Sequence, residues 1–345
     1  MIDKYLLNTT IFLSAALLLS LFTACSDNPL EVDLQDVHID LTYHRLDQDF
    51  FDKNVDRLDT NAIDQLEETY GAFFQTYTEE ILGEGYWSDP MFLINLNRFR
   101  DDLGMNDIQE SINKEFNDIS REKQALTQAF RHYHYYFPDS IIPEIVLFNS
   151  GYNFAIYPSE KHLGIGLEWF IGPEKDIIKR LPNDIFPNYI KKKMKREYFA
   201  SDAMKGWLLV NFYEEIENAD FISQVVFYGK IMYLLDAMMP TTPDSIKMNY
   251  TAEQAEWVED NEKHIWKYLV EQDMLFSHDQ KEISKFVQEA PFTSGLHRES
   301  PPKVGVWLGW QMVRAHMNRT PELTLHDLID EKNYKRIMKS YKPKK

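Results

Sequence analysis

The sequence predicts an α+β fold, predominantly helical, in which a single compact helical domain holds a small central β-sheet. Apolar residues recur every three to four positions through most of the chain, as in amphipathic helices. Short apolar runs separated by turns, at residues 145–148, 154–157 and 163–167, are typical of strands. Of the 345 residues, 44% are hydrophobic, and no repeat or low-complexity linker divides the chain. Two closely packed subdomains are the open alternative.

The first part of the chain predicts one strand followed by helices. Residues 37–41 alternate between apolar and polar side chains, as a strand does. Thr60 is placed to cap a helix that ends at Gly83. Further helices are expected to start at Asp89-Pro90, at Asn106 and at Ser120, the last of them ending before Pro138.

The second part, beyond Pro173, returns to a helical pattern. Thr251 with Gln254, and Thr324 with Asp327, both fit capping boxes, in which two side chains satisfy free backbone N–H groups at a helix start.

The N-terminus predicts a lipoprotein signal. A charged start precedes an apolar run that ends in Leu-Phe-Thr-Ala-Cys at residues 21–25. A small residue directly before Cys25 resembles the lipobox of bacterial lipoproteins, whose cysteine is acylated and becomes the new N-terminus. The expected organisation is residues 1–24 as signal peptide, 25–36 as acylated tether and 37–345 as the folded domain. An uncleaved anchor over Tyr5–Ala24 and ordinary secretion are the alternatives.

Composition limits the partners and the chemistry. The formal net charge is −18, which argues against nucleic acid and against adsorption to anionic headgroups. Palmitate-type chains on Cys25 are therefore expected to hold the protein on a membrane. Cys25 is the only cysteine, so neither an internal disulfide nor thiolate catalysis is available. Ser26 stands where an inner-membrane retention signal often has aspartate, which slightly favours the outer membrane, with the body in the periplasm or at the cell surface.

The sequence contains no catalytic or cofactor-binding motif. No histidine is followed by glutamate, so the zinc motif H-E-x-x-H is absent. Gly164-Ile165-Gly166 lacks the third glycine of a dinucleotide loop, and close backbone packing explains it better. His132 and His134 would point about 200° apart on a helix, which favours aromatic packing over a shared metal. We therefore expect no catalytic residue, no cofactor and no metal.

A basic cluster at residues 191–196 is unusual in so acidic a chain. On a helix, Ile190, Met194 and Tyr198 would fall on one side and the cations on the other. We therefore predict a solvated helix face, with Glu197 at its edge. A site for an anionic partner or headgroup is the alternative.

A candidate interaction surface follows from the loop Glu289–Pro302 and the helix after it. Trp307, Trp310 and Arg314 share a predicted helix face, and aromatic residues with arginine are common interface anchors. Gly305 and Gly309 would let another backbone approach closely. The proposed surface residues are Phe292, Arg298, Trp307, Trp310 and Arg314. A flap that covers the core is an equally good interpretation of the loop.

Four stretches of this chain resemble the gliding motility lipoprotein B (GldB) family of the Bacteroidota. They are Val37–Phe51, His162–Gly172, Tyr250–Trp257 with Asn261–Trp266 and, most specifically, Glu289–Gly295 with Gly305–Gln311. The resemblance covers almost the whole mature chain. It implies an acylated envelope protein that acts non-enzymatically with gliding machinery, whose adhesins depend on type IX secretion, and that has other envelope proteins as partners. Because members also occur in bacteria that do not glide, motility of this cell does not follow.

The C-terminal half also resembles a group of gluzincin-type peptidases. The common order is a helix near residues 186–200, a helix near 220–239 and then a Gly-x-x-x-Gly-Trp helix. The peptidases carry their metal motif on the first of these, where this chain has Lys191–Tyr198 and no histidine. The resemblance implies a zincin-like scaffold without the metal site. The alternative function is an atypical hydrolase that uses Glu197 and Glu168 near His162 or His297.

Overall fold

The computed structural model describes residues 28–344. The chain divides between Asp33 and Leu34, and the larger of its two units begins at Leu34. The predicted signal peptide, Cys25 and the alternative anchor lie outside the described residues. Within the described part, none of the helices is both long and apolar enough to cross a membrane.

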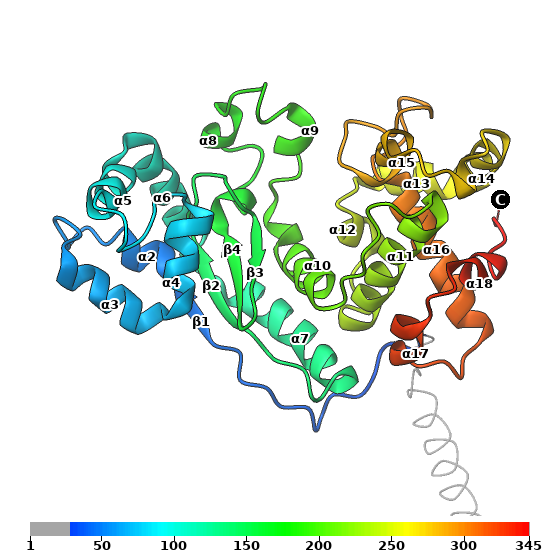
Figure 1. The fold of residues 1–345 in the computed structure, drawn as a ribbon, viewed down its shortest axis with the longest axis horizontal. Coiled ribbons are helices and arrows are strands. Elements are labelled where there is room, and N and C mark those ends of the chain that lie inside the picture. The colour runs from blue at the N-terminus through cyan, green and yellow to red at the C-terminus, as the bar shows by residue number, and fades with distance from the viewer. Residues whose placement is uncertain (1–27, 345) are drawn as a thin grey trace, which may run out of the picture. The chain divides into compact units, whose positions relative to one another are not determined.

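The fold of the larger unit is α+β and mostly helical, as predicted (Figure 1). Its first part contains β1 (Tyr43–Arg45), α2 (Leu46–Phe50), α3 (Thr60–Tyr70), α4 (Ala72–Thr76), the π-helix η2 (Tyr77–Ile81), α5 (Phe92–Asp101), α6 (Leu103–Glu115), α7 (Ser120–Tyr136), β2 (Glu144–Phe148), β3 (Ile156–Pro158), β4 (His162–Gly166) and η3 (Leu167–Phe170). Its second part contains α8 (Asp176–Lys179), α9 (Asn188–Lys191), η4 (Arg196–Tyr198), α10 (Phe199–Asn211), α11 (Phe221–Met238), α12 (Asp244–Met248), α13 (Ala252–Asp260), α14 (Glu262–Glu271), η5 (Met274–Phe276), α15 (Gln280–Val287), α16 (Val304–Arg319), α17 (Leu325–Asp330) and α18 (Tyr334–Lys339).

The sheet has the strand order β1-β2-β4-β3. The first three strands are parallel and β3 is antiparallel to β4. Val146 of β2 lies beside Gly164 of β4, and both belong to the face that α4 covers. The other face carries Ile156 and Ile165, and α10 packs against it. The packing is close: a Cβ atom at Gly206 of α10 would lie 2.6 Å from Ile156 Cγ2.

Glycines in β4 make room for aromatic rings between the sheet and the first helices. A Cβ atom at Gly164 would lie 2.7 Å from Phe73 Cζ and 2.8 Å from Phe148 Cε1, and one at Gly166 would lie 2.2 Å from Phe154 O. The prediction that Gly164-Ile165-Gly166 serves close packing is confirmed. The rings belong to an aromatic core that also includes Phe50, Phe74, Tyr77 and Phe92, all buried.

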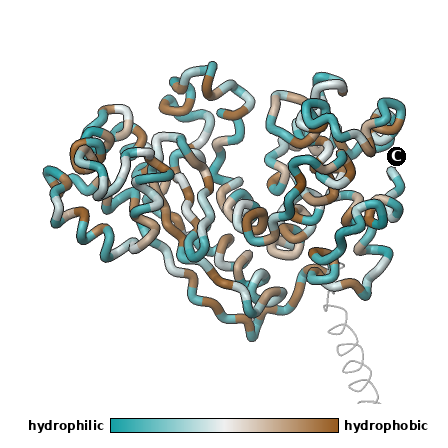
Figure 2. The backbone as a smooth tube through the Cα atoms, viewed as in Figure 1, coloured by the Kyte–Doolittle hydropathy of each residue, from teal (hydrophilic) through white to brown (hydrophobic). Residues whose placement is uncertain are grey.

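Helix α11 is the centre of the second part. Sixteen of its eighteen residues are buried, so it has no solvent-facing side. It crosses α16 at very short range: a Cβ atom at Gly309 would lie 1.7 Å from Val225 O, and one at Gly229 would lie 2.3 Å from Gly309 C. The predicted role of Gly309 in a close backbone approach is therefore confirmed. By contrast, α3 to α5 alternate between hydrophobic and hydrophilic residues, as helices with one buried face do (Figure 2).

Several predicted boundaries are wrong. Residues 37–41 are not a strand. The guanidinium of Arg131 on α7 donates hydrogen bonds to the carbonyl oxygen of Val37, at 2.9 Å, and to that of Leu34. The helix from Thr60 breaks at Gly71, whose φ is 52°. Pro90 lies in a turn, and α5 starts after it. Helix α6 begins at Leu103, ahead of the predicted Asn106.

Other predicted boundaries are confirmed. Helix α7 runs from Ser120 to Tyr136 and ends before Pro138. Both capping boxes, at Thr251 and Thr324, are present.

Candidate functional site

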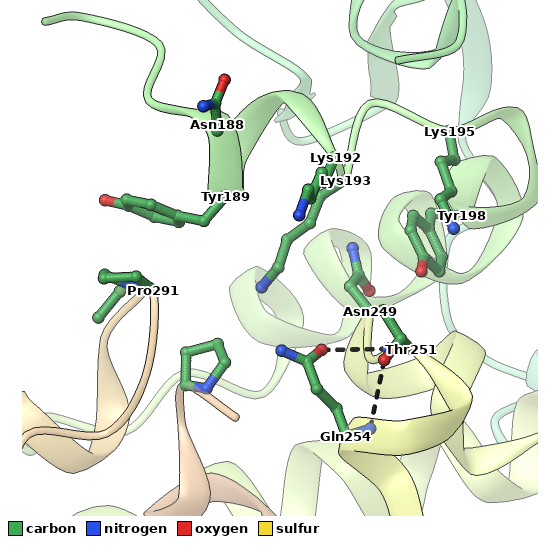
Figure 3. Close-up of a pocket in the computed structure, with 12 residues that line it drawn as sticks. Asn188, Tyr189, Lys192, Lys193, Lys195, Tyr198, Asn249, Thr251, Gln254 and Pro291 are labelled. Carbon is green, nitrogen blue, oxygen red and sulfur yellow. Dashed lines mark hydrogen bonds between the residues drawn. The ribbon is translucent and has the colours of Figure 1, made fainter. Parts of the chain in front are cut away.

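A pocket of about 510 Å³ lies where three segments of the second part meet. The segments are α9 with the chain after it, the junction of α12 and α13, and the two ends of the loop before α16. The lining residues are Asn188, Tyr189, Lys192, Lys193, Lys195, Tyr198, Asn249, Thr251, Gln254, Ala290, Pro291 and Pro302. Figure 3 shows lysine side chains extending from the chain after α9 towards the space between Tyr189 and Gln254.

The basic cluster is not a solvated helix face, and that prediction is wrong. Helix α9 ends at Lys191, and the chain then turns, with Lys195 N donating to Lys193 O at 2.8 Å. Lys191 is buried, and its ammonium donates to Lys179 O at 3.2 Å and Asn183 Oδ1 at 2.9 Å. The continuous helix near residues 186–200, on which the gluzincin resemblance places the metal motif, is therefore absent from this chain.

Arg196, the last cation of the cluster, also has partners in another part of the fold. Its guanidinium holds both carboxylate oxygens of Glu122 on α7, at 2.8 and 2.6 Å. The cluster thus ties separate elements together, and its members do not share one exposed surface.

A carboxylate between two ammonium groups lies behind the pocket wall at Lys193. Glu289 Oε2 lies 2.5 Å from Lys193 Nζ, and Glu289 Oε1 pairs with Lys303 Nζ. Although burial opposes it, the pull of Lys303 and Lys193 lowers the pKa of Glu289 to about 2. Burial, with repulsion from Lys303, lowers the pKa of Lys193 to about 8. One negative charge therefore holds two positive charges at this edge of the pocket.

Lys205 of α10 lies next to this group. Its ammonium is 3.0 Å from Asp202 Oδ1 and 3.3 Å from Asn249 Oδ1, while Asn249 Nδ2 donates to Asp202 Oδ2 at 2.9 Å. Burial lowers the pKa of Lys205, and Lys303 adds to the effect. Asn249 has a φ of 56°, a left-handed conformation that asparagine tolerates, and this ends α12 and turns the amide towards Lys205.

The remaining two lining lysines differ in their partners. Lys195 Nζ lies 3.1 Å from Glu197 Oε1 and 5.6 Å from the centre of the Tyr198 ring. Lys192 is exposed, and its ammonium makes no ion pair or hydrogen bond with any of the residues that the structure describes. Lys192 therefore brings an uncompensated positive charge to the pocket.

A buried ionic network fixes the helix that leads into the pocket. Asp236 of α11 accepts from Lys247 at 2.7 Å, from Trp310 Nε1 at 2.8 Å and from Arg314 at 2.7 and 2.9 Å. Arg314 also binds Asp244 with both terminal nitrogens, at 2.5 and 2.9 Å. Because Asp244 and Lys247 both lie on α12, the network clamps α12 to α11 and α16 and so places the α12–α13 junction.

The predicted interaction surface is only partly exposed. Trp307 and Trp310 are 4% and 0% exposed, so they belong to the core and cannot meet a partner; their inclusion was wrong. The cause is the close crossing of α11 and α16, which buries that face of α16. Arg314 stacks on Trp310 at 3.8 Å and is held in the network. Arg298 is exposed and Phe292 is half-buried, so these residues can contact a partner.

The loop before α16 is firmly tied at its base. Thr293 Oγ1 donates to Pro301 O at 2.7 Å, and the buried Tyr250 donates to Pro302 O at 2.6 Å. The two ends of the loop supply Ala290, Pro291 and Pro302 to the pocket wall. The base of the loop packs on the core, as a covering flap would, and it also lines the pocket.

The residues of the hydrolase alternative do not converge. His162 opens β4 and Glu168 follows its other end, about 15 Å away at strand spacing. Glu168 is fully buried, His297 lies in an exposed part of the loop, and Glu197 is exposed beside Lys195. Burial raises the pKa of Glu168 to about 7, while hydrogen bonds from Ser150 oppose the shift.

Metal ligands are likewise not gathered. His132 Nδ1 lies 3.0 Å from Gln128 O of its own helix. Within residues 28–344, no group of three or more His, Cys, Asp or Glu side chains could hold a metal ion.

Sequence reasoning found the basic residues of the pocket but missed its other walls. Asn249, Gln254 and Pro302 lie more than fifty residues beyond the lining lysines, and no local pattern connects the two sets. The sequence feature that came closest to predicting these walls was the capping box of Thr251 and Gln254. It identifies the start of a helix but does not show which part of the protein that helix end faces.

The geometry describes an α+β protein with a ligand-sized basic pocket. The family model described as "Gliding motility protein GldB" matches residues 27–343, and the chain belongs to this family. Searches of curated proteins and of solved structures gave no significant match. Family membership makes the chain a gliding motility protein of a lipoprotein family. The resemblance of the C-terminal half to gluzincin-type peptidases stays a prediction.

Proposed function

We propose that this protein is a lipid-anchored component of the gliding or type IX secretion-associated machinery of the cell envelope, and that it acts by contact and not by catalysis. The family match over residues 27–343 carries the proposal. The matched region begins at residue 27, two residues after Cys25, and Cys25 would be the first residue of an acylated mature chain. The acylated tether is proposed to be residues 25–36, which lead into the larger unit that begins at Leu34.

The membrane anchor is tested at Cys25. One acyl chain gives marginal membrane binding and several make attachment effectively permanent, so Cys25→Ala should abolish fatty-acid labelling and release the protein from the membrane fraction. An alkyne-palmitate label followed by fractionation measures both. Cys25→Ser serves as a second variant of nearly the same size. Labelling that survives in both variants would contradict the anchor.

The contact surface is proposed to be the exposed part of the loop before α16, with Arg298 and Phe292 as its leading residues. This part projects from a base that Tyr250 and Thr293 hold in place, so a partner would meet a preorganised loop. Preorganisation lowers the entropy that binding must offset.

A photo-crosslinking residue placed at Arg298 should capture an envelope protein in intact cells. The matched control is the same residue at Leu103 on α6, which is 84% exposed and lies outside the loop. Capture of the same bands from both positions, or of none from position 298, would count against this surface. Secretion of type IX cargo in a strain that carries only Arg298→Glu then tests whether the contact matters.

A further inference from the structure

We propose that the lysine-lined pocket binds a phosphate monoester carried by a sugar- or glycerol-sized molecule. This site is separate from the exposed loop surface of the proposed function, and neither depends on the other.

The first argument is charge. The chain has 55 acidic and 37 basic residues, yet the pocket lining contains Lys192, Lys193 and Lys195 and no Asp or Glu. Behind the lining, Glu289 is shared by Lys193 and Lys303, so this group keeps one positive charge. Lys192 adds a second, uncompensated charge. A dianion is the ligand that such an excess of positive charge favours.

The second argument is the kind of cation. All cationic lining residues are lysines, and none is an arginine. Ammonium groups are compact point charges with three rotatable donors, and lysine is a common phosphate ligand, whereas the planar fork of arginine matches carboxylates and phosphates alike. A phosphate monoester carries a charge between about −1.5 and −2 at neutral pH. Two lysine ammonium groups can therefore both pair with it.

The third argument is the rest of the pocket. A volume of about 510 Å³ is much larger than a lone phosphate needs and falls within the usual range of small-molecule sites. Tyr189, Pro291 and Pro302 give flat apolar walls. On the opposite side, Gln254 accepts the Thr251 N–H at 3.1 Å through its oxygen, and its side-chain nitrogen points into the pocket (Figure 3). A sugar or glycerol body would find both an apolar face and an amide donor.

The test uses the full-length protein in a non-ionic detergent and isothermal titration. Glucose 6-phosphate should bind, glucuronate should bind more weakly and glucose should not bind. Lys192→Ala should weaken glucose 6-phosphate binding about tenfold, because one charge-assisted contact is lost. The exposed Lys263→Ala on α14 is the matched control and should change the affinity less than twofold. Neither lysine has an ionic partner among the described residues, so both variants should fold.

A further variant and a further ligand sharpen the result. Tyr189→Ala should weaken glucose 6-phosphate binding and leave inorganic phosphate binding unchanged, since the ring contacts only the body of the ligand. Short-chain phosphatidic acid, below its micelle concentration, presents the same phosphate on a lipid. Binding of glucose 6-phosphate assigns a soluble ester, and binding of phosphatidic acid alone assigns a lipid headgroup. Absence of binding to both, or equal effects of Lys192→Ala and Lys263→Ala, would overturn the proposal.

Discussion

The two parts of the larger unit are stabilised in different ways. Between the sheet and helices α2 to α5, the core is a cluster of aromatic rings packed against glycines of β4. Around α11, the core also contains charges: Lys230, Asp236 and Lys247 are buried, and each is paired. The first part buries single charged groups such as Asp47 and Glu168 within a mainly apolar core, whereas in the second part Asp236, Lys247 and Arg314 form one network whose partners must all be present.

This difference explains where the pocket forms. Buried charges need directional partners, and satisfying them fixes α12 relative to α11 and α16. The α12–α13 junction then faces the chain after α9 with polar groups, and the pocket lies between them. Aromatic packing is tolerant of small shifts and supplies no comparable set of polar groups. The comparison predicts that removing one charge in the second part will cost more than crowding a ring in the first.

The largest effect is expected for Asp236→Ala. Asp236 is the acceptor for Lys247, Arg314 and Trp310, and the Lys247 side chain is only 2% exposed. Leaving these groups unpaired should lower the free energy of unfolding by about 3–5 kcal/mol. Urea denaturation measures it. Asp244→Ala is the matched control, since Arg314 keeps Asp236, and it should cost only about 1 kcal/mol. Equal losses in the two variants would show that the buried network does not dominate.

A pair of glycine substitutions compares the two parts directly. A Cβ atom at Gly309 would lie 1.7 Å from a backbone oxygen, so α11 and α16 would have to separate. Gly309→Ala should cost at least about 3 kcal/mol. At Gly164 the nearest atoms belong to the rings of Phe73 and Phe148, which can move, so Gly164→Ala should cost about 1–2 kcal/mol. Thermal denaturation of both variants decides the order, and the reverse order would contradict the comparison.

A smaller effect is expected for the pH dependence caused by Glu168, the buried carboxyl beside the sheet. Its pKa is about 7 in the folded protein and 4.5 when unfolded, so the folded state binds its proton more strongly. Its contribution to stability is fully present below pH 4.5 and is lost as the pH rises through 7. Between pH 5 and 8 the loss should approach about 2–3 kcal/mol.

Glu168→Gln should remove this contribution, because the amide does not titrate. Unfolding free energies at pH 5 and pH 8 should then differ less in the variant than in the natural protein. Glu322→Gln, at an exposed position, should leave the difference unchanged. A natural protein that is equally stable at both pH values would contradict the raised pKa of Glu168.

Local sequence signals predicted much of the fold. The apolar runs at 145–148 and 163–167 correspond to β2 and β4, and the run at 154–157 overlaps β3. The start of α7 at Ser120 and both capping boxes were found because each depends on residues within one turn of helix. The prediction of a strand at residues 37–41 was wrong, because an extended segment outside the sheet can show the same alternation of apolar and polar residues. In this segment the carbonyl of Val37 accepts a hydrogen bond from Arg131.

The sequence by itself determined the α+β class, the family, and the periodic helices and strands, because hydrophobic spacing and capping are properties of neighbouring residues. Only the tertiary structure decided which charged and aromatic side chains are buried and which groups they contact. Trp307 and Trp310 lie in the core because α11 crosses α16 at Gly309. Lys192 and Lys193 became a pocket wall because the chain turns after Lys191 and meets segments more than fifty residues away. Which partner a charged side chain finds depends on the packing of distant elements, and no local pattern records that.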